Sequence, residues 1–368
     1  MNRYGETAEQ APLSKTTTEG IRIHELAEDM PHVPIGRFAR MPGDERIFAL
    51  ACRFPSAGES GTVFVSADHG ETWTPTGAFS PDGSLEATDS GAFMITAQGT
   101  LIAAFGNAAE KSNWHWDPEL KDSPGARLPT YVTRSLDGGK TWQDTQKLHD
   151  EWTGANRDML QTRDGRVVFT SMKLLHNPGR HSVLTYGSDD DGVTWTPSNI
   201  IDLGGNGHHD GVTEASLIEL NDGRLLEYIR TNWGQLWRAF SNDGGRSWHP
   251  HGPAGIDAGS TPPFLERLQD GRIVLLWNRK FPQGETSWPL SGGDGIWSAT
   301  PASNFREELS ISFSEDECDT WAPPVVIARN EGGEACYPYL FEPEPGVLWI
   351  MAHRFGLRMR IRVSDVAK

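Results

Sequence analysis

Five copies of one eight-residue phrase run through this chain and constrain its fold more than any other feature. Each copy reads Ser-x-Asp-x-Gly-x-Thr/Ser-Trp, and only the last departs from it, with Cys318 in place of the glycine. The copies begin at Ser66, Ser135, Ser188, Ser241 and Ser314. In such a phrase the Asp accepts hydrogen bonds from the turn backbone, Gly supplies a positive φ and Trp covers the hairpin base. The five boxes predict a repeat architecture made of β-hairpins.

A second repeat alternates with the boxes. Six segments place a turn before an apolar, β-rich run, and they begin near Glu45, Gln98, Asp164, Asp222, Asp270 and Pro345. Six such units, each too small to bury a core alone, predict an all-β fold: a six-bladed β-propeller of four-stranded blades. The sixth blade lacks one strand, and we expect IRIHELA (21–27) to supply it. The expected organisation is a disordered leader over 1–20 and a single propeller domain over 21–368.

Composition excludes several classes of function. The formal net charge of -17 argues against nucleic acid or an anionic membrane surface as a partner, and an apolar run long enough to span a bilayer is absent from the sequence. Three cysteines, Cys52, Cys318 and Cys336, show neither metal-ligand spacing nor a disulfide framework. We therefore expect no metal or cofactor and a cytoplasmic protein, or a secreted or periplasmic one if a leader was removed. The oligomeric state is left open.

The propeller topology indicates where chemistry belongs. The turns before the apolar runs and the boxes lie on one face, so the box aspartates are expected to build turns. The opposite face collects the ends of the second strands, which are Arg53, Asn107, Lys173, Arg230, Arg279 and His353-Arg354. These mostly cationic ends predict a positive ring that binds an anion, because arginine offers a bidentate fork to a carboxylate. The alternative is that individual arginines pair with carboxylates between blades.

Loops on that same face carry further candidates. Two long insertions (108–129 and 280–305) hold Trp114, Trp116, Trp288 and Trp297, which either stack on sugar rings or simply pack the loops. Polar clusters between blades contain Arg157, Asp158, His208, His209, Asp210, Glu214, Glu334, Tyr337 and Tyr339. We expect these clusters to bind sugar hydroxyls or to serve acid–base roles, with a His-His-Asp metal site as the alternative.

Three segments carry a resemblance to a known family. EASLIELNDGRLLEYIRT is similar to Glu-Pro-Ser-Val-Val-Glu-Leu-x-Asp-Gly-Arg-Leu-x-x-x-x-Arg of the sialidase (neuraminidase) superfamily, whose members are six-bladed propellers with such boxes. REELSISFSED and CYPYLFE resemble two later segments of that family. The resemblance covers about residues 30 to 365. It implies that Tyr337 is the nucleophile, that Glu214 is its base, and that Arg230 and Arg306 bind a substrate carboxylate.

The chain also departs from the family pattern. The first carboxylate-binding arginine has no clean match, since the nearest positions are His32, Arg37 and Arg40. After Arg53 the chain reads FPSAGESG, so Glu59 stands where the family has a catalytic Asp. Sialic acid itself is therefore less strongly implied than an acidic sugar.

We expect an exo-acting glycoside hydrolase that removes a terminal carboxylate-bearing sugar from an acidic oligosaccharide or glycan. One alternative is a lyase that acts on uronic-acid glycans with a histidine or tyrosine base. The rim histidines that favour it are His32, His115, His208, His209 and His353. Another alternative is a carbohydrate-binding propeller without catalysis, because fold alone does not settle function.

Overall fold

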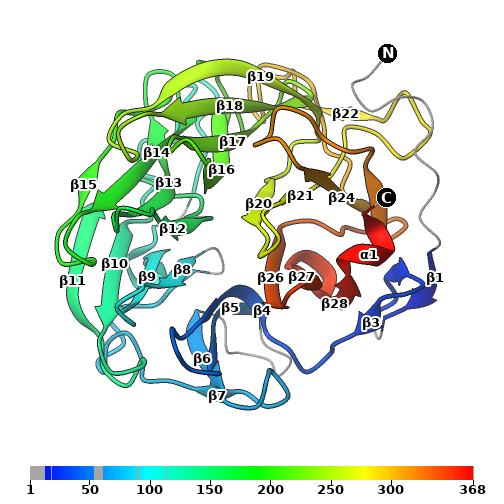
Figure 1. Cartoon of the computed structure of the whole chain (residues 1–368). Helices are drawn as coiled ribbons and strands as arrows, with labels where there is room; N and C mark the ends of the chain where they lie inside the picture. The colour runs from blue at the N-terminus through cyan, green and yellow to red at the C-terminus, as the bar shows by residue number, and fades with distance from the viewer. Residues whose placement is uncertain (1–12, 18, 54–60, 89–90, 113, 368) are drawn as a thin grey trace.

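Six antiparallel sheets surround a central axis in the computed structural model (Figure 1). The description covers residues 13–17, 19–53, 61–88, 91–112 and 114–367. Blade one holds β4 (Ile35–Arg40), β5 (Ile47–Arg53), β6 (Thr62–Ser66) and β7 (Thr74–Pro75). Blade two holds β8 (Ala92–Ile95), β9 (Leu101–Gly106), β10 (Thr130–Ser135) and β11 (Gln143–His149). Blade three holds β12 (Met159–Gln161), β13 (Val167–Leu175), β14 (Arg180–Ser188) and β15 (Thr196–Pro197).

The second half of the ring continues the pattern. Blade four holds β16 (Val212–Glu219), β17 (Leu225–Thr231), β18 (Gln235–Ser241) and β19 (His249–Asp257). Blade five holds β20 (Phe264–Arg267), β21 (Ile273–Trp277), β24 (Glu308–Ser314) and β25 (Val325–Arg329). Blade six holds β26 (Pro338–Glu344), β27 (Val347–Ala352) and β28 (Leu357–Arg362), with β3 (Glu28–Asp29) on its outer edge. The predicted six-bladed, all-β fold is confirmed.

The N-terminal segment closes the ring differently from the sequence expectation. Within 21–27, Arg22–His24 forms β2, which extends blade five beyond β25, while blade six is completed by β3. Ile21, Ile23 and Ala27 are fully buried in the core shared by blades five, six and one. The apolar residues of 21–27 therefore fill this core. The strand that completes blade six, β3, consists of two polar residues because it lies at the outer edge, which faces solvent.

The boundary of the expected leader is also wrong. Leu13–Thr16 forms β1, which pairs with β2 at the edge of blade five, so order begins inside the segment expected to be a leader. The rest of that segment, residues 1–12 and 18, lies outside the described residues.

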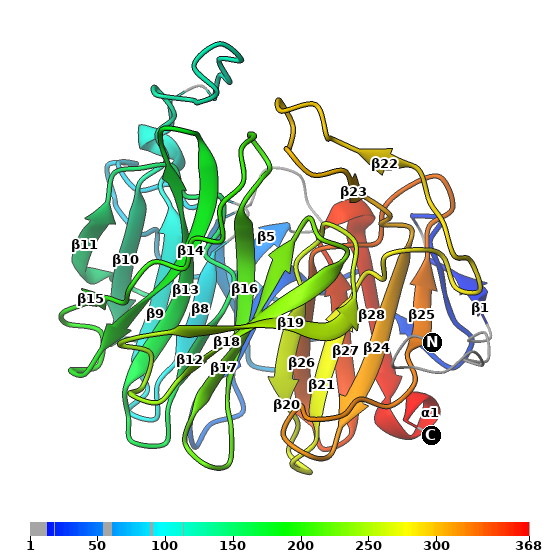
Figure 2. The same ribbon diagram turned by 90° about the horizontal axis from the view of Figure 1, so that it is seen from above.

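Helical structure is sparse in the described ranges. It consists of α1 (Val363–Val366) and two 3-10 turns, η1 (Ala108–Glu110) and η2 (Arg354–Gly356). No helix among these residues is long and apolar enough to cross a membrane. A small hairpin, β22 (Leu290–Ser291) with β23 (Ala302–Ser303), lies in the connection between β21 and β24. Figure 2 shows this connection and the one after β9 projecting from the same face of the ring.

Second strands of the blades are buried on both faces. Every residue of β9, β21 and β27 is buried. Each sheet packs against both neighbours, so these strands read as continuous apolar runs rather than as alternating ones. The cores therefore lie between blades, as with Leu226, Tyr228, Leu275 and Trp277 between blades four and five.

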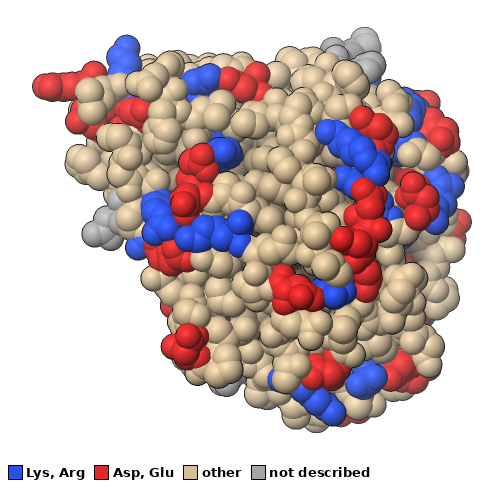
Figure 3. Space-filling view, turned by 90° about the vertical axis from the view of Figure 1, so that its left-hand side faces the viewer, with Lys and Arg blue, Asp and Glu red and all other residues tan. Residues whose placement is uncertain are grey.

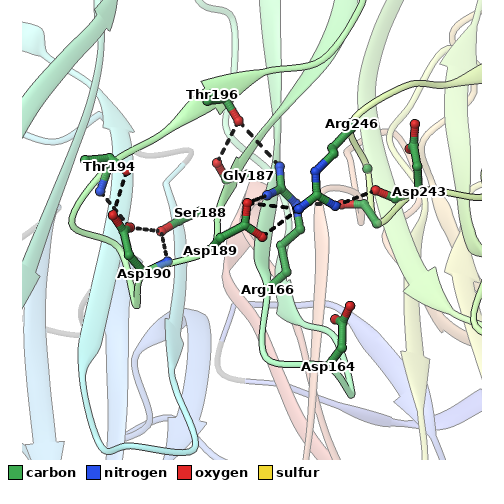
Figure 4. A network of polar contacts seen from close by, with 12 residues as sticks. Asp164, Arg166, Gly187, Ser188, Asp189, Asp190, Thr194, Thr196, Asp243 and Arg246 are labelled. Atoms are coloured by element: carbon green, nitrogen blue, oxygen red, sulfur yellow. Dashed lines mark hydrogen bonds and ion pairs between the residues drawn. The ribbon is translucent and has the colours of Figure 1, made fainter.

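The five boxes form one repeated hydrogen-bond arrangement. In the third copy (Figure 4), the Asp190 carboxylate accepts bonds from the Ser188 hydroxyl at 2.8 Å and from the amide and hydroxyl of Thr194 at 2.8 and 2.6 Å. The Ser188 hydroxyl in turn accepts a bond from the Gly192 amide at 2.8 Å. Cys318, at φ +69°, keeps the equivalent bond to Ser314. The box carboxylates are therefore hydrogen-bonded within their own turns, and the boxes have a structural role.

Arginines link the boxes of adjacent blades. Arg166 forms an ion pair with Asp189 and donates to the Gly244 carbonyl at 2.8 Å, while Arg246 reaches Asp189 at 2.8 Å (Figure 4). Elsewhere on the outer wall, Arg127 lies 2.8 Å from Glu110, and the space-filling view of that side shows cations beside carboxylates (Figure 3). Arginines on this side of the molecule thus lie beside carboxylates that pair with them.

Replacing a box aspartate tests its structural role. Asp190→Ala removes three hydrogen bonds from the turn, so we expect the free energy of unfolding to fall by about 1–2 kcal/mol. Urea unfolding measures the loss, and Val193→Ala, at an exposed position in the same turn, is the control. Unchanged stability of Asp190→Ala would contradict the turn-building role.

Glu227 provides a second stability test. Its side chain lies between blades three and four beside Leu225 and Ile229, 1% exposed, and neither carboxyl oxygen has a hydrogen-bond partner among the described residues. Burial raises the pKa of Glu227 from 4.5 to about 8. Between these values the unfolded chain loses the proton while the folded chain keeps it. Stability therefore falls as pH rises through this window.

Glu227→Gln removes this penalty. We expect the free energy of unfolding of the variant, relative to that of the wild type, to rise by about 1.4 kcal/mol for each pH unit between pH 5.5 and 7.5. Urea unfolding at both pH values measures the difference. Glu45→Gln, which makes the same charge change at a position whose side chain is 75% exposed, is the control. A pH-independent difference would show that Glu227 is ionised in the folded protein.

Candidate active site

Tyr337 is the centre of an arginine cluster at the axis. It directly precedes β26 and is half-buried. Arg230 donates to its hydroxyl oxygen at 3.3 Å. The guanidinium carbons of Arg157, Arg306 and Arg354 lie 5.5, 5.7 and 5.6 Å from the centre of its ring. Four blades thus each direct one arginine at a single tyrosine.

Glu214 shares the guanidinium of Arg230 with Tyr337. A β-bulge between Thr213 and Ala215 turns Glu214 toward Arg230, the cross-strand partner of Thr213 on β17. The Glu214 carboxylate, 6% exposed, accepts a hydrogen bond from Nη1 of Arg230, the same atom that bonds the Tyr337 hydroxyl. The two oxygens are therefore within about 6 Å, two hydrogen-bond lengths.

The environment of Arg230 favours its charged form. Burial alone would lower the pKa of Arg230, but the Glu214 carboxylate and the Tyr337 hydroxyl raise it above its ordinary value. This buried cation is held between the two groups that the resemblance names as base and nucleophile. A guanidinium in that position orients both side chains and stabilises negative charge on either.

Glu214 and Tyr337 also occupy a left-handed backbone conformation that residues other than glycine rarely adopt. Glu214 has φ +29° and Tyr337 has φ +60°. Most other non-glycine residues with positive φ in the described ranges lie in turns, whereas these two lie at the starts of inner strands. Such backbone strain concentrates at functional sites, where surrounding contacts maintain it.

Ser260 connects two of the arginines and escaped the sequence analysis. Its hydroxyl accepts bonds from Nε and Nη2 of Arg230 at 3.3 and 3.0 Å and donates to Asn232 at 2.7 Å. Its carbonyl accepts a bond from Arg306 at 3.0 Å. The only signal in the sequence is a small polar residue in the loop before β20, which does not distinguish it from other loop serines.

Arg157 and Asp158 bond to the propeller itself. Arg157, 2% exposed, donates to the Tyr339 hydroxyl and to the Pro338 carbonyl, both at 3.0 Å. The Asp158 carboxylate lies 2.8 Å from Arg37 and accepts bonds from the Ser216 hydroxyl and the Leu217 amide. Arg157 thus supports the segment that carries Tyr337, and Asp158 joins three blades.

Among the described side chains, the predicted ring of cations does not form an open anion funnel, because several of its members have partners of their own. Lys173 lies 2.9 Å from Glu151, and Arg279 lies 3.3 Å from Asp257. Asn107 is buried and bonds to backbone groups of Glu86 and Ser84. The chain has 50 acidic residues against 33 basic ones, so acidic side chains outnumber the cations with which they can pair. Two other members of the expected ring, Arg230 and Arg354, lie at Tyr337 instead.

The residues of the His-His-Asp sequence, His208 to Asp210, interact mainly with loop backbone and with each other. Asp210 is buried, and its carboxylate accepts hydrogen bonds from the amides of Asn206, Gly211 and Ala299. His208 and His209 contact each other through their Nδ1 atoms. His209 is exposed and His208 is half-buried. Groups of three or more potential metal ligands do not occur among the described residues.

The predicted tryptophan platforms differ in exposure. Trp116 is 8% exposed and packs on His208, so it is a loop-packing residue and its expected stacking role is wrong. Its indole fills space beside Gly179. Trp297 is half-buried and stacks on His209 with the rings 5.4 Å apart. Trp288 packs against Phe305 at 4.7 Å.

Other expected residues are placed away from the cluster or not described. Arg37 pairs with Asp158, and Arg40 donates to the Pro343 carbonyl at 2.6 Å, so neither directs its guanidinium at Tyr337. The Arg53 side chain and the whole of Glu59, the candidate acid, lie outside the described residues.

Comparisons with known proteins agree with this architecture. Residues 63–350 match the family described as BNR repeat-like domain. A sialidase from Micromonospora viridifaciens is 25% identical over 65% of this chain and 38% of its own length. A sialidase from Bacteroides fragilis is 22% identical over 82% of this chain and 56% of its own. The chain therefore spans less than two thirds of either relative.

Solved structures show the same fold at low identity. A protein of unknown function from Dyadobacter fermentans superposes with a TM-score of 0.60 at 18% identity, over 91% of this chain and 98% of its own. The NanB sialidase of Streptococcus pneumoniae, as its K499G mutant, gives 0.55 at 13% identity, over 100% of this chain and 71% of its own.

Proposed function

The chain belongs to the BNR repeat-like family within the sialidase-like superfamily, and we propose that it is a glycoside hydrolase removing a terminal acidic sugar from a glycan. One observation carries the proposal. The Tyr337 hydroxyl and the Glu214 carboxylate meet on one guanidinium nitrogen of Arg230, both on strained backbone. A protein that only bound sugars would have no need of a carboxylate base beside a tyrosine.

In the proposed reaction, the Tyr337 oxygen attacks the anomeric carbon. Its proton passes to Glu214 as the new bond forms, because a neutral phenol is a poor nucleophile at neutral pH. The glycosidic bond breaks, and the departing oxygen takes a proton from an acid at the substrate. Water then cleaves the tyrosyl–sugar bond and gives one proton back to that acid, while the proton on Glu214 returns to the phenolate. A neutral nucleophile avoids setting a second carboxylate against that of the substrate.

The charge around Tyr337 supports an acidic substrate. Four guanidinium groups surround the ring, and two of them, those of Arg306 and Arg354, share the one carboxylate of Glu334 at 3.6 and 3.9 Å. This pair of arginines therefore carries more positive charge than Glu334 neutralises, within a chain of net charge -17. A substrate carboxylate would supply the missing negative charge and would accept the planar arginine forks.

The proposal is tested by incubating the protein with a panel of acidic oligosaccharides and weighing the products. Hydrolysis adds one water to the products, and we expect this mass. Elimination adds none and creates an unsaturated uronate that absorbs in the ultraviolet, which would favour a lyase with a histidine or tyrosine base. Binding without any product would favour a carbohydrate-binding propeller.

Two conservative substitutions test the nucleophile and base. We expect Tyr337→Phe and Glu214→Gln each to lower kcat at least ~1,000-fold while substrate still binds, because each removes one partner of the attack. Single-turnover rates and calorimetric binding provide the measurements. Tyr131→Phe, the same change on β10 of blade two, is the matched control and should keep its turnover. A normal kcat for Tyr337→Phe would exclude this mechanism.

The two arginines linked by Ser260 should respond differently to substrate charge. Arg230 contacts Glu214 and Tyr337, so Arg230→Ala should lower kcat/KM at least ~30-fold for acidic and for carboxyl-reduced substrates alike. Arg306→Ala should do so for the acidic substrate only. Equal losses on both substrates for Arg306→Ala would mean that this arginine only holds blades together.

A further inference from the structure

The four arginines around Tyr337 differ in how many of their donors the protein already uses. Arg230 donates through Nε and Nη2 to Ser260 and through Nη1 to Glu214 and Tyr337. Arg157 uses both terminal nitrogens on Tyr339 and Pro338. A guanidinium has five N–H donors in a fixed fork. Arg230 and Arg157 are also only 5% and 2% exposed, so neither presents a guanidinium edge to a substrate, which departs from the carboxylate-binding role expected for Arg230.

Arg306 and Arg354 are more exposed than Arg230 and Arg157. Arg306 donates to the Ser260 carbonyl at 3.0 Å, but its Nε is buried and has no hydrogen-bond partner within the described ranges. Its side chain is only 11% exposed, so water cannot readily substitute. Arg354, on η2, has a side chain 52% exposed. Both guanidinium groups lie over the Tyr337 ring, at 5.7 and 5.6 Å.

The carboxylate of Glu334 bridges these two arginines loosely. One oxygen lies 3.6 Å from Nη1 of Arg306, and the other lies 3.9 Å from Nε of Arg354. Charge-assisted bonds between such groups are normally about 2.7–2.9 Å. Glu334 stands on the loop between blades five and six and is 31% exposed. A carboxylate held by two guanidinium groups beside the proposed nucleophile is the arrangement that an acidic sugar would require.

We propose that Glu334 is an internal stand-in for the substrate carboxylate. Arg306 and Arg354 form the anion subsite, Glu334 occupies it in the empty protein, and the carboxylate of the sugar displaces Glu334 on binding. This assignment rests on the proposed function, because the displacing group is the acidic sugar. It adds Arg354 as a substrate-binding residue and makes Glu334 a determinant of affinity, which weakens the binding of ligands unable to replace it at both arginines.

Binding measurements separate this role from a merely structural one. Calorimetric titrations with N-acetylneuraminate and D-glucuronate, and with neutral N-acetylmannosamine and D-glucose, should be made on the full chain. We expect Glu334→Gln to tighten the Kd of at least one of the two acids about 3- to 10-fold and to leave the neutral sugars unchanged. Glu331→Gln makes the same charge change at an exposed position of the same loop. This control should leave all four Kd values unchanged.

Arg354→Ala supplies the second arm. It should weaken binding of the same acid at least ~10-fold, and the gain from Glu334→Gln should vanish when both changes are combined. Unaltered or weaker acid binding by Glu334→Gln would overturn the proposal, as would failure of this variant to bind either acid. An equal gain in Glu331→Gln would also overturn it. Acid binding that behaves as expected, without turnover of any glycan, would refute the hydrolase while leaving the anion subsite in place.

Discussion

The blades bury both of their faces against one another, so the ring must close, and the pairing of β3 with β28 joins an N-terminal strand to the last blade. Second strands such as β9, β21 and β27 are wholly buried, so a blade with a missing neighbour would expose an apolar sheet face. Met359 and Arg360 pair with Asp29 and Glu28, and this contact completes the last blade. Ile21 and Ile23 extend the same closure into the core shared by blades five, six and one.

Closure also determines what the axis can do chemically. The residues around Tyr337 come from blades three, four, five and six, and a shift of one blade would separate them. Arg230 is positioned by Glu214 of its own blade and by Ser260 from the next. Rigid sheets thus hold loop and strand-end side chains at bonding distance, which is how a propeller supports a site that no single blade contains.

Much of the fold was predictable because it is encoded locally. The Asp-Gly-Arg turns and the boxes use side chains within a few residues of one another, so the sequence reveals them directly. The residues Glu214, Tyr337, Arg230 and Arg306 were found through family segments, and the structure brings these four together. Ser260 and the pairing of Glu334 with Arg354 escaped notice, since they depend on which loops meet across blades. The closing strand was misjudged because apolar residues favoured 21–27, whereas the pairing residues are the polar Glu28 and Asp29.

The pairing of Asp29 with Met359 has a consequence for the time course of folding. Nearly the whole chain separates these partners, and contacts between distant residues form slowly because a large loop must first be closed. During synthesis, blades one to five can assemble on one another while the first and last of them still present open sheet faces. Until β28 is synthesised, the ring is open and these apolar faces are exposed. Aggregation with other chains is therefore most favoured during this interval.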